Sequence, residues 1–259
     1  MDNNTELNVN DIISNAFTTG IKNWIKISLT LLLFAVSCWI PYLNIGAVIS
    51  FTGFIILISK DKPITPTHLF NKYYIKKFPD YALLTFLWYG GFFGAMMLLF
   101  NGAGWAGLLT IFVPITILSL TWFVSFYLCL DKDIDPIKSI YLSNKITHGY
   151  KGTIFGGFLL LGLCFIGITC VTGAVLWLLG YALSDVLITV ETYTISEGDY
   201  EYEDFYYRYS AAFYGFLVFA GFIGFAIMSL FTSIFMGACA YTYKCLEPLT
   251  ELESNSTYK

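Results

Sequence analysis

The sequence predicts an all-α integral membrane protein, a single-domain bundle of six membrane-spanning helices. Hydrophobic residues make up 57% of its 259 residues and charged residues only 12%, against roughly 45–50% and roughly 25% in ordinary globular domains. Four long segments contain no charged residue and no histidine. Lysine gathers in alternate connections between the predicted spans, and this alternation predicts that both ends of the chain lie in the cytoplasm.

The four charge-free segments locate the predicted spans. An ionised side chain at mid-bilayer costs roughly 2.5–3.5 kcal/mol, so long stretches without one are typical of hydrocarbon surroundings. Since a span needs about 20 apolar residues, the two longest segments are each divided at a turn. The turns are predicted at 41–46 and 101–104, and Pro114 should kink the fourth span. The predicted spans are 24–40, 45–59, 81–100, 105–130, 153–179 and 210–243.

Amphipathic helices are predicted before the first, third and fifth spans, at about 9–22, 66–77 and 136–147. Thr65-Pro66 and Asp135-Pro136 each place a capping residue before a proline at the first helical position. The order helix, span, span would then occur three times, which predicts a threefold internal repeat. The alternative is that any basic connection between spans looks amphipathic. Lysines in these helices are candidate contacts for anionic lipid headgroups: Lys22, Lys72, Lys76, Lys77, Lys138 and Lys145.

Residues 185–209 form an acidic, tyrosine-rich insertion that the topology places outside the cytoplasm. Strand-forming residues at 190–195 and a glycine-containing turn at 196–199 predict a short β-hairpin, with one face aromatic and the other acidic. The alternatives are a solvated acidic loop and a helical extension of the fifth span. The candidate residues for partner recognition are Tyr200, Glu201, Tyr202, Glu203 and Phe205. Residues 247–259 form a polar C-terminal tail.

No residue pattern indicates catalysis, a cofactor or a metal. The six cysteines form no CxxC pair, and their spacing fits neither a disulfide framework nor a zinc site. His68 and His148 have no further metal ligands near them in the sequence. The net charge of −4 has the wrong sign for a nucleic-acid-binding protein.

The predicted span interiors contain polar but no charged side chains, which weakens the hypothesis of an ion-coupled transporter. Hydrogen bonds to the backbone or to neighbouring helices explain the hydroxyl groups most simply. These belong to Ser119, Thr121, Ser125, Ser229, Thr232 and Ser233. Small residues four apart predict close helix packing within the chain or between subunits. The pairs are Gly90 with Gly94, Gly152 with Gly156, and Ala220 with Gly224.

Several segments resemble a group of uncharacterised bacterial integral membrane proteins, which includes the membrane domain sometimes fused to glycerophosphoryl diester phosphodiesterases. The similar segments are 136–140 with Ser143, Gly149 and Lys151, then 163–167, the opening 8–13, the turn 40–46 and the terminal 240–243. The resemblance implies a six-span bundle in the bacterial cytoplasmic (inner) membrane. In relatives with the phosphodiesterase, that activity belongs to a separate catalytic domain. The stretch 191–209 departs from the family's pattern.

These observations predict a non-enzymatic, multi-pass membrane protein without cofactors. Its predicted role is a scaffold or an accessory subunit that contacts the lipid bilayer or other membrane proteins. A transporter or channel for a small solute or a lipid is the alternative. A lipid-modifying enzyme ranks last, because no acid–base pair lies at membrane depth.

Overall fold

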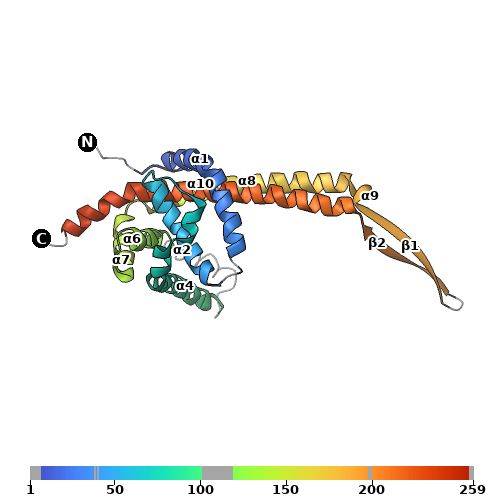
Figure 1. Ribbon diagram of the computed structural model, residues 1–259, viewed down its shortest axis with the longest axis horizontal. Helices are drawn as coiled ribbons and strands as arrows, with labels where there is room; N and C mark the ends of the chain where they lie inside the picture. The colour runs from blue at the N-terminus through green and yellow to red at the C-terminus, as the bar shows by residue number, and fades with distance from the viewer. Residues whose placement is uncertain (1–6, 38, 40, 101–118, 198–199, 257–259) are drawn as a thin grey trace. The chain divides into compact units, whose positions relative to one another are not determined.

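The computed structural model describes residues 7–37, 39, 41–100, 119–197 and 200–256. Contacts divide the chain into two compact units, whereas the sequence predicted a single domain. Unit 1 comprises Met1–Leu161 with Ser229–Lys259, and unit 2 comprises Gly162–Met228. The described residues are predominantly helical, with one β-hairpin (Figure 1).

Three helices of the described chain are long and apolar enough to cross a membrane, at Val9–Ser37, Lys151–Ala182 and Ala211–Thr250. Only about 17% of the most apolar stretch of each helix is buried within the protein. This agrees with the prediction of a helical membrane protein. The count of six spans and the threefold repeat remain predictions.

Helix α1 (Val9–Ser37) joins two elements that the sequence separated, the amphipathic helix at 9–22 and the span at 24–40. No proline interrupts the junction, so the backbone hydrogen bonds continue through it. The direction of α1 changes along its length (Figure 1). At its start, Asn8 caps the helix, because its side-chain oxygen accepts a 3.1 Å hydrogen bond from the amide of Asn10.

Helix α2 (Pro41–Ser59) begins where the sequence predicted a turn, so the prediction that the second span starts at Ile45 is wrong. Proline at the first helical position already has the backbone angle that a helix requires. Gly46 lies within the helix rather than in a turn. A Cβ atom added there would lie 2.9 Å from the side chain of Ile75, so this glycine admits a neighbouring segment.

The second amphipathic segment is not one helix, because it breaks at Asn71. A 3₁₀ helix, η1 (Pro66–Phe70), is followed by the short helix α3 (Lys72–Lys76) and then by α4 (Phe78–Phe100). Asn71 has an extended backbone, and its side chain accepts a 3.0 Å hydrogen bond from the amide of Tyr73. Asparagine thereby ends one helical turn and caps the next.

Helix α6 (Ser125–Asp131) leads into α7 (Pro136–Ile146), which begins as the sequence predicted. The carboxylate of Asp135 accepts hydrogen bonds from the amides of Ile137 and Lys138. Only the end of the fourth predicted span is described. The turn at 101–104 and the kink at Pro114 fall outside the described residues.

The core of unit 1 joins α1, α2, η1, α6, the beginning of α8 and the end of α10. Its largest fully buried side chains include Ile12, Phe54, Leu69, Leu128, Ile154 and Tyr243. Helices α1 and α10 approach closely at two glycines. A Cβ atom at Gly237 would lie 2.8 Å from the carbonyl oxygen of Ala16, and one at Gly20 would lie 2.6 Å from the Cα atom of Ile234.

Unit 2 contains the end of α8 (Lys151–Ala182), the short helix α9 (Ser184–Leu187), the hairpin and the beginning of α10 (Ala211–Ser256). Strands β1 (Ile188–Glu197) and β2 (Tyr200–Tyr209) pair antiparallel, from Ile188 opposite Tyr209 to Glu197 opposite Tyr200. The predicted hairpin is therefore present. The hydroxyl of Ser210 donates a 2.7 Å hydrogen bond to the carbonyl oxygen of Val186, which ties the end of β2 to α9.

Candidate functional site

A network of ion pairs connects the ends of α2, α6 and α10 within unit 1. The carboxylate of Asp131 pairs with Lys60 and accepts a 2.8 Å hydrogen bond from the hydroxyl of Tyr243. The carboxylate of Glu247 lies 2.8 Å from the ammonium of Lys132 and 3.9 Å from that of Lys60. The Asp131 side chain is only 9% exposed, so its charge depends on these partners. We call these five residues the three-helix network.

The three-helix network holds three segments of unit 1 together. Both of its carboxylates are paired with lysines, which offsets the charge of two largely buried groups. Sequence analysis missed the network, because its members come from three separate segments. The one signal was local: Asp131 and Lys132 directly follow a charge-free run.

Three further ion pairs lie near the ends of the same helices and involve two lysines. Lys244 and Asp61 approach to 2.6 Å, which joins α10 to the loop after α2. Lys77, at the end of α3, pairs with Asp133 and lies 3.4 Å from Asp80. The hydrogen bond with Asp133 raises the pKa of Lys77 above its ordinary value. Lys77 is therefore occupied within the protein and is a weaker candidate for lipid contact than the sequence suggested.

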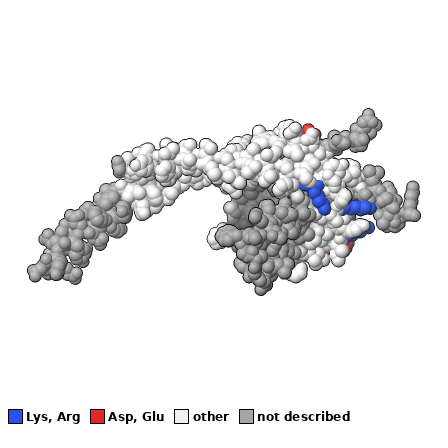
Figure 2. Space-filling view, turned by 180° about the vertical axis from the view of Figure 1, so that it is seen from behind, with Lys and Arg blue, Asp and Glu red and all other residues white. Residues whose placement is uncertain are grey.

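The other lysines predicted to contact lipid headgroups differ in their exposure and in their interactions within the protein. Lys22, Lys72, Lys76 and Lys138 are exposed, and within the described part of the chain they form no ion pair. Lys145 is partly buried and takes part in interactions of its own. On the face shown in Figure 2, the described basic side chains lie close together.

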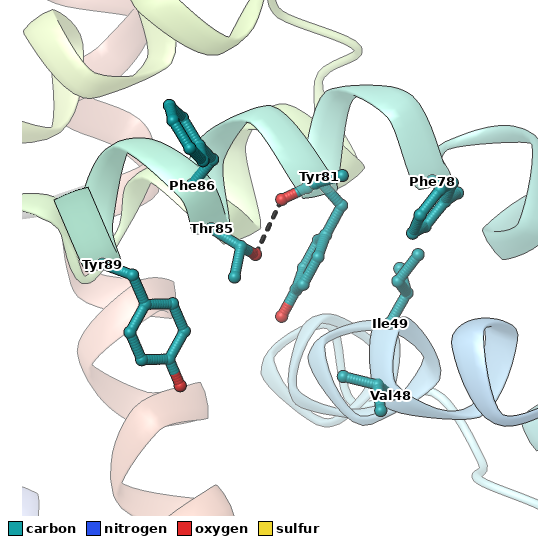
Figure 3. Close-up of a pocket in the computed structure, with 8 residues that line it drawn as sticks. Val48, Ile49, Phe78, Tyr81, Thr85, Phe86 and Tyr89 are labelled. Atoms are coloured by element: carbon teal, nitrogen blue, oxygen red, sulfur yellow. Dashed lines mark hydrogen bonds between the residues drawn. The ribbon is translucent and has the colours of Figure 1, made fainter.

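An apolar groove of about 470 Å³ lies between α2 and α4. Val48 and Ile49 of α2 form one side (Figure 3). The other side is formed by α4, through Phe78, Tyr81, Ala82, Thr85, Phe86 and Tyr89. The volume is within the roughly 300–1,000 Å³ typical of small-molecule sites. Sequence analysis missed this groove, because nothing local distinguishes its lining from the rest of an apolar helix.

The described surface of unit 2 is apolar and unusually exposed. Its segments 162–184 and 209–228 contain no Lys, Arg, Asp, Glu or His. Trp177 is 68% exposed, Tyr181 72% and Phe222 70%. Trp177 and Tyr181 stack on one another one turn apart on α8. Contiguous exposed apolar surface of this kind marks a membrane or a protein interface.

All five candidate recognition residues lie in β2. The register pairs Tyr200 with Glu197, Tyr202 with Ile195 and Phe205 with Thr192. The division into one aromatic and one acidic face stays a prediction.

Hydroxyl groups in the predicted spans form hydrogen bonds within unit 1. The Ser233 hydroxyl donates to the carbonyl oxygen of Gly20 at 2.7 Å, and the indole of Trp24 donates to the Ser229 hydroxyl at 2.9 Å. Ser125 donates to the carbonyl oxygen of Trp122 at 2.5 Å. The hydroxyls of Ser233 and Ser229 therefore join α10 to α1, whereas that of Ser125 bonds locally, three residues back in the chain.

The small-residue pairs predicted from sequence show no approach as close as that of α1 and α10. In the described chain, a Cβ atom at Gly90, Gly152 or Gly224 would meet nothing within 4 Å, and one at Gly156 would lie 3.5 Å from the side chain of Val9 on α1. Close approach occurs instead at Gly20 and Gly237. The same spacing of small residues occurs at both sites, in two separate segments of the sequence. Gly20 lies four residues after Ala16, and Gly237 lies four residues after Ser233.

Among the described residues, no group of three or more His, Cys, Asp or Glu side chains is arranged to hold a metal ion. His68 lies beside the ring of Phe54, with a centroid distance of 6.5 Å. Comparison with models of known protein families, with curated proteins and with solved structures found no match.

Proposed function

We propose that this protein is a non-enzymatic integral membrane scaffold or accessory subunit, which crosses the bilayer and holds partner proteins or lipids. The observation that supports it most strongly is the apolar surface of unit 2. Large side chains there are exposed, and the segments 162–184 and 209–228 contain no charged residue in the sequence. Such a surface is stable in hydrocarbon or against another apolar protein, and unstable in water.

In the proposed topology the chain crosses a bacterial cytoplasmic membrane six times, and both termini lie in the cytoplasm. The alternation of lysine-rich and lysine-free connections supports this orientation. The 32 residues of α8 span about 48 Å, which exceeds the roughly 30 Å of hydrocarbon. Helix α8 should therefore tilt or project beyond the bilayer. In this topology η1, α3 and α7 lie along the cytoplasmic interface, as does the start of α1.

The hairpin is the proposed recognition element on the opposite side of the membrane. It follows an apolar helix and precedes another, and its sequence is acidic and rich in tyrosine. Two strands alone are marginally stable in water, so neighbouring structure or a partner should support them. A partner with basic groups would complement the charge.

The proposed topology is tested by labelling single cysteines in intact cells, in a background in which all six native cysteines are replaced. A membrane-impermeant maleimide should react at Ser196→Cys and should not react at Ile75→Cys or Ile140→Cys. After the cells are opened, all three positions should become accessible to the reagent if they lie in water. Labelling at 75 or 140 in intact cells, with none at 196, would contradict the orientation.

The proposed role is tested with the purified full-length protein. A protein partner that co-purifies in fixed stoichiometry supports a scaffold or subunit. Replacing Tyr200, Tyr202 and Phe205 by serine should abolish binding of that partner if the hairpin recognises it. The control variant Tyr214→Ser, on the apolar surface of α10, should still bind the partner. Solute flux in liposomes without a partner would favour a transporter or channel instead, and turnover of lipid would favour an enzyme.

A further inference from the structure

The groove between α2 and α4 is suited to an apolar ligand, because its lining is mostly apolar and the hydroxyl groups of Tyr81 and Thr85 are already bonded inside the protein. The hydroxyl of Tyr81 forms a 2.9 Å hydrogen bond with that of Thr52 on α2. The hydroxyl of Thr85 donates to the carbonyl oxygen of Tyr81 at 2.8 Å, as Figure 3 shows. A polar solute that entered the groove would lose its hydrogen bonds to water and would gain none from the hydroxyls of Tyr81 and Thr85.

The groove is open at the side, so a ligand could reach it along the bilayer. Four lining residues are each more than a third exposed: Val48 at 46%, Phe78 at 42%, Phe86 at 73% and Tyr89 at 49%. The buried end is formed by Ile49, which is 1% exposed, with Tyr81 beside it (Figure 3). A slot with an apolar floor and an open side fits a flexible hydrocarbon chain.

Basic side chains lie next to one end of the groove. Phe78 lines the groove and begins α4, directly after α3. Lys76 is two residues earlier, so its Cα atom lies within about 7.6 Å of that of Phe78. Lys72 is one turn before Lys76, and both are exposed and form no ion pair in the described chain. Ile75 packs against Gly46, which holds α3 on the same helix that forms the groove.

We infer that the α2–α4 groove binds one acyl chain of an anionic phospholipid, whose phosphate group contacts Lys72 and Lys76. This inference rests on the proposed membrane placement. Hydrocarbon in the groove covers the apolar side chains. The negatively charged phosphate is the ionic partner that the two lysine ammonium groups do not have within the described chain. Lys77 is excluded from this role because Asp133 and Asp80 already hold its ammonium group.

The lysines distinguish this ligand from two other occupants. A zwitterionic phospholipid would fill the groove equally well but would have less attraction for two ammonium groups. A second copy of the chain would bring the same two exposed lysines to the interface, where like charges repel one another. Charge complementarity therefore favours the anionic lipid.

The test uses the full-length protein in phosphatidylcholine vesicles that contain a small fraction of a photoreactive lipid. Two probes carry the same diazirine acyl chain, one on phosphatidylglycerol and one on phosphatidylcholine. Cross-linked positions are mapped by mass spectrometry of peptides. Cross-links on Leu163 and Val171 of α8, which are 54% and 65% exposed, serve as the internal reference for ordinary bilayer contact.

The expected result is preferential cross-linking of the phosphatidylglycerol probe at Val48, Ala82 and Phe86, relative to the positions on α8. Replacing both lysines, as Lys72→Gln with Lys76→Gln, should reduce this preference by about fivefold for each lysine removed. The matched control, Lys22→Gln with Lys138→Gln, removes the same charge from exposed lysines on α1 and α7 and should retain the preference.

A second variant tests the groove itself. Ala82→Phe places a ring in the groove and should reduce cross-linking by both probes at Val48 and Phe86. The control, Ala182→Phe, adds the same ring at an exposed position at the end of α8 and should have no effect there.

Three outcomes would overturn the inference. Equal cross-linking by both probes, or groove labelling no stronger than that on α8, would mean ordinary contact with bulk lipid. Disulfide-linked dimers formed through Phe86→Cys, in a background without the native cysteines, would mean that a second subunit occupies the groove. An absence of labelling on α8 as well would contradict the membrane placement itself, so the two failures are distinguishable.

Discussion

The hydroxyl of Tyr243 donates a 2.8 Å hydrogen bond to the carboxylate of Asp131, 112 residues earlier in the chain. Tyr243 is fully buried, and its ring lies 5.4 Å from that of Tyr127. The bond joins the end of α10 to the end of α6, at a carboxylate that Lys60 also holds. Two long-range contacts thus converge on one nearly buried charge, and this convergence leads to the first prediction.

We expect Tyr243→Phe to destabilise the protein by about 1–3 kcal/mol, because a hydrogen bond to a charged group contributes roughly that much. The ring is retained, so the loss reports the hydroxyl and not the packing. The measurement is the free energy of unfolding of the full-length protein in mixed micelles. The control Tyr214→Phe changes a tyrosine on α10 that is 60% exposed, and it should leave the free energy of unfolding unchanged.

A double-mutant cycle checks the assignment to Asp131. In combination with Asp131→Asn, the effect of Tyr243→Phe should shrink by at least about 0.5 kcal/mol, since the two residues act on one another. Strict additivity of the two changes would show that the tyrosine hydroxyl acts elsewhere.

The second prediction concerns the close approach of α1 and α10. Gly237→Ala should destabilise the protein by about 1–3 kcal/mol, because the new methyl group would lie 2.8 Å from the backbone oxygen of Ala16. Backbone atoms can move away less easily than a flexible side chain. Unfolding in mixed micelles measures the loss.

Gly167→Ala is the matched control on α8. A methyl group there meets nothing within 4 Å in the described chain. Alanine is also the better helix former by about 1 kcal/mol, so this variant should be as stable as the parent or more stable. Equal destabilisation by both changes would contradict the close approach of α1 and α10.

The third prediction is an effect of alkaline pH through Lys77. Its hydrogen bond with Asp133 raises the pKa of Lys77 in the folded protein. A raised pKa means that the folded state binds the proton more tightly than the unfolded chain does. The resulting stability is therefore complete below the unfolded value of about 10.4, and it is lost as the pH rises through the higher folded value.

The measurement compares unfolding of the parent protein and of Lys77→Gln across this alkaline range. We expect the parent to lose more stability than the variant as the pH rises above about 10.4. Lys62→Gln, at an exposed lysine after α2, should behave like the parent. Parallel pH profiles for the parent and Lys77→Gln would refute the contribution of this pair.

Local features of the fold were predictable from sequence, because neighbouring residues determine them. Asp135 before Pro136 correctly predicted the start of α7, and strand-forming residues around a turn correctly predicted the hairpin. Local signals failed where two of them competed. Pro41 was read as a helix breaker, although proline suits the first helical position equally well.

The candidate sites were less predictable, because tertiary contacts create them. Nothing near Asp131 in the sequence indicates Lys60 or Tyr243 as partners. The groove likewise depends on where α3 and α4 pack against α2. The lysine positions on α3 were nevertheless identified from sequence, since an amphipathic segment beside a predicted span indicates an interface.

The last prediction distinguishes the hairpin from its two alternatives by the pattern of amide exchange over 190–206. Each strand of a two-stranded sheet has a partner on one side only, so alternate amides should be protected and those between them should exchange freely. A helical extension of α8 would instead protect consecutive amides, and a solvated loop would protect none. The register places Thr192 opposite Phe205 and Thr194 opposite Glu203. The amides of two facing residues should therefore be either both protected from exchange or both unprotected. Hydrogen exchange resolved to single residues, on the full-length protein in nanodiscs, measures it. Exchange at the unprotected rate throughout would contradict the hairpin, and with it the proposed recognition surface.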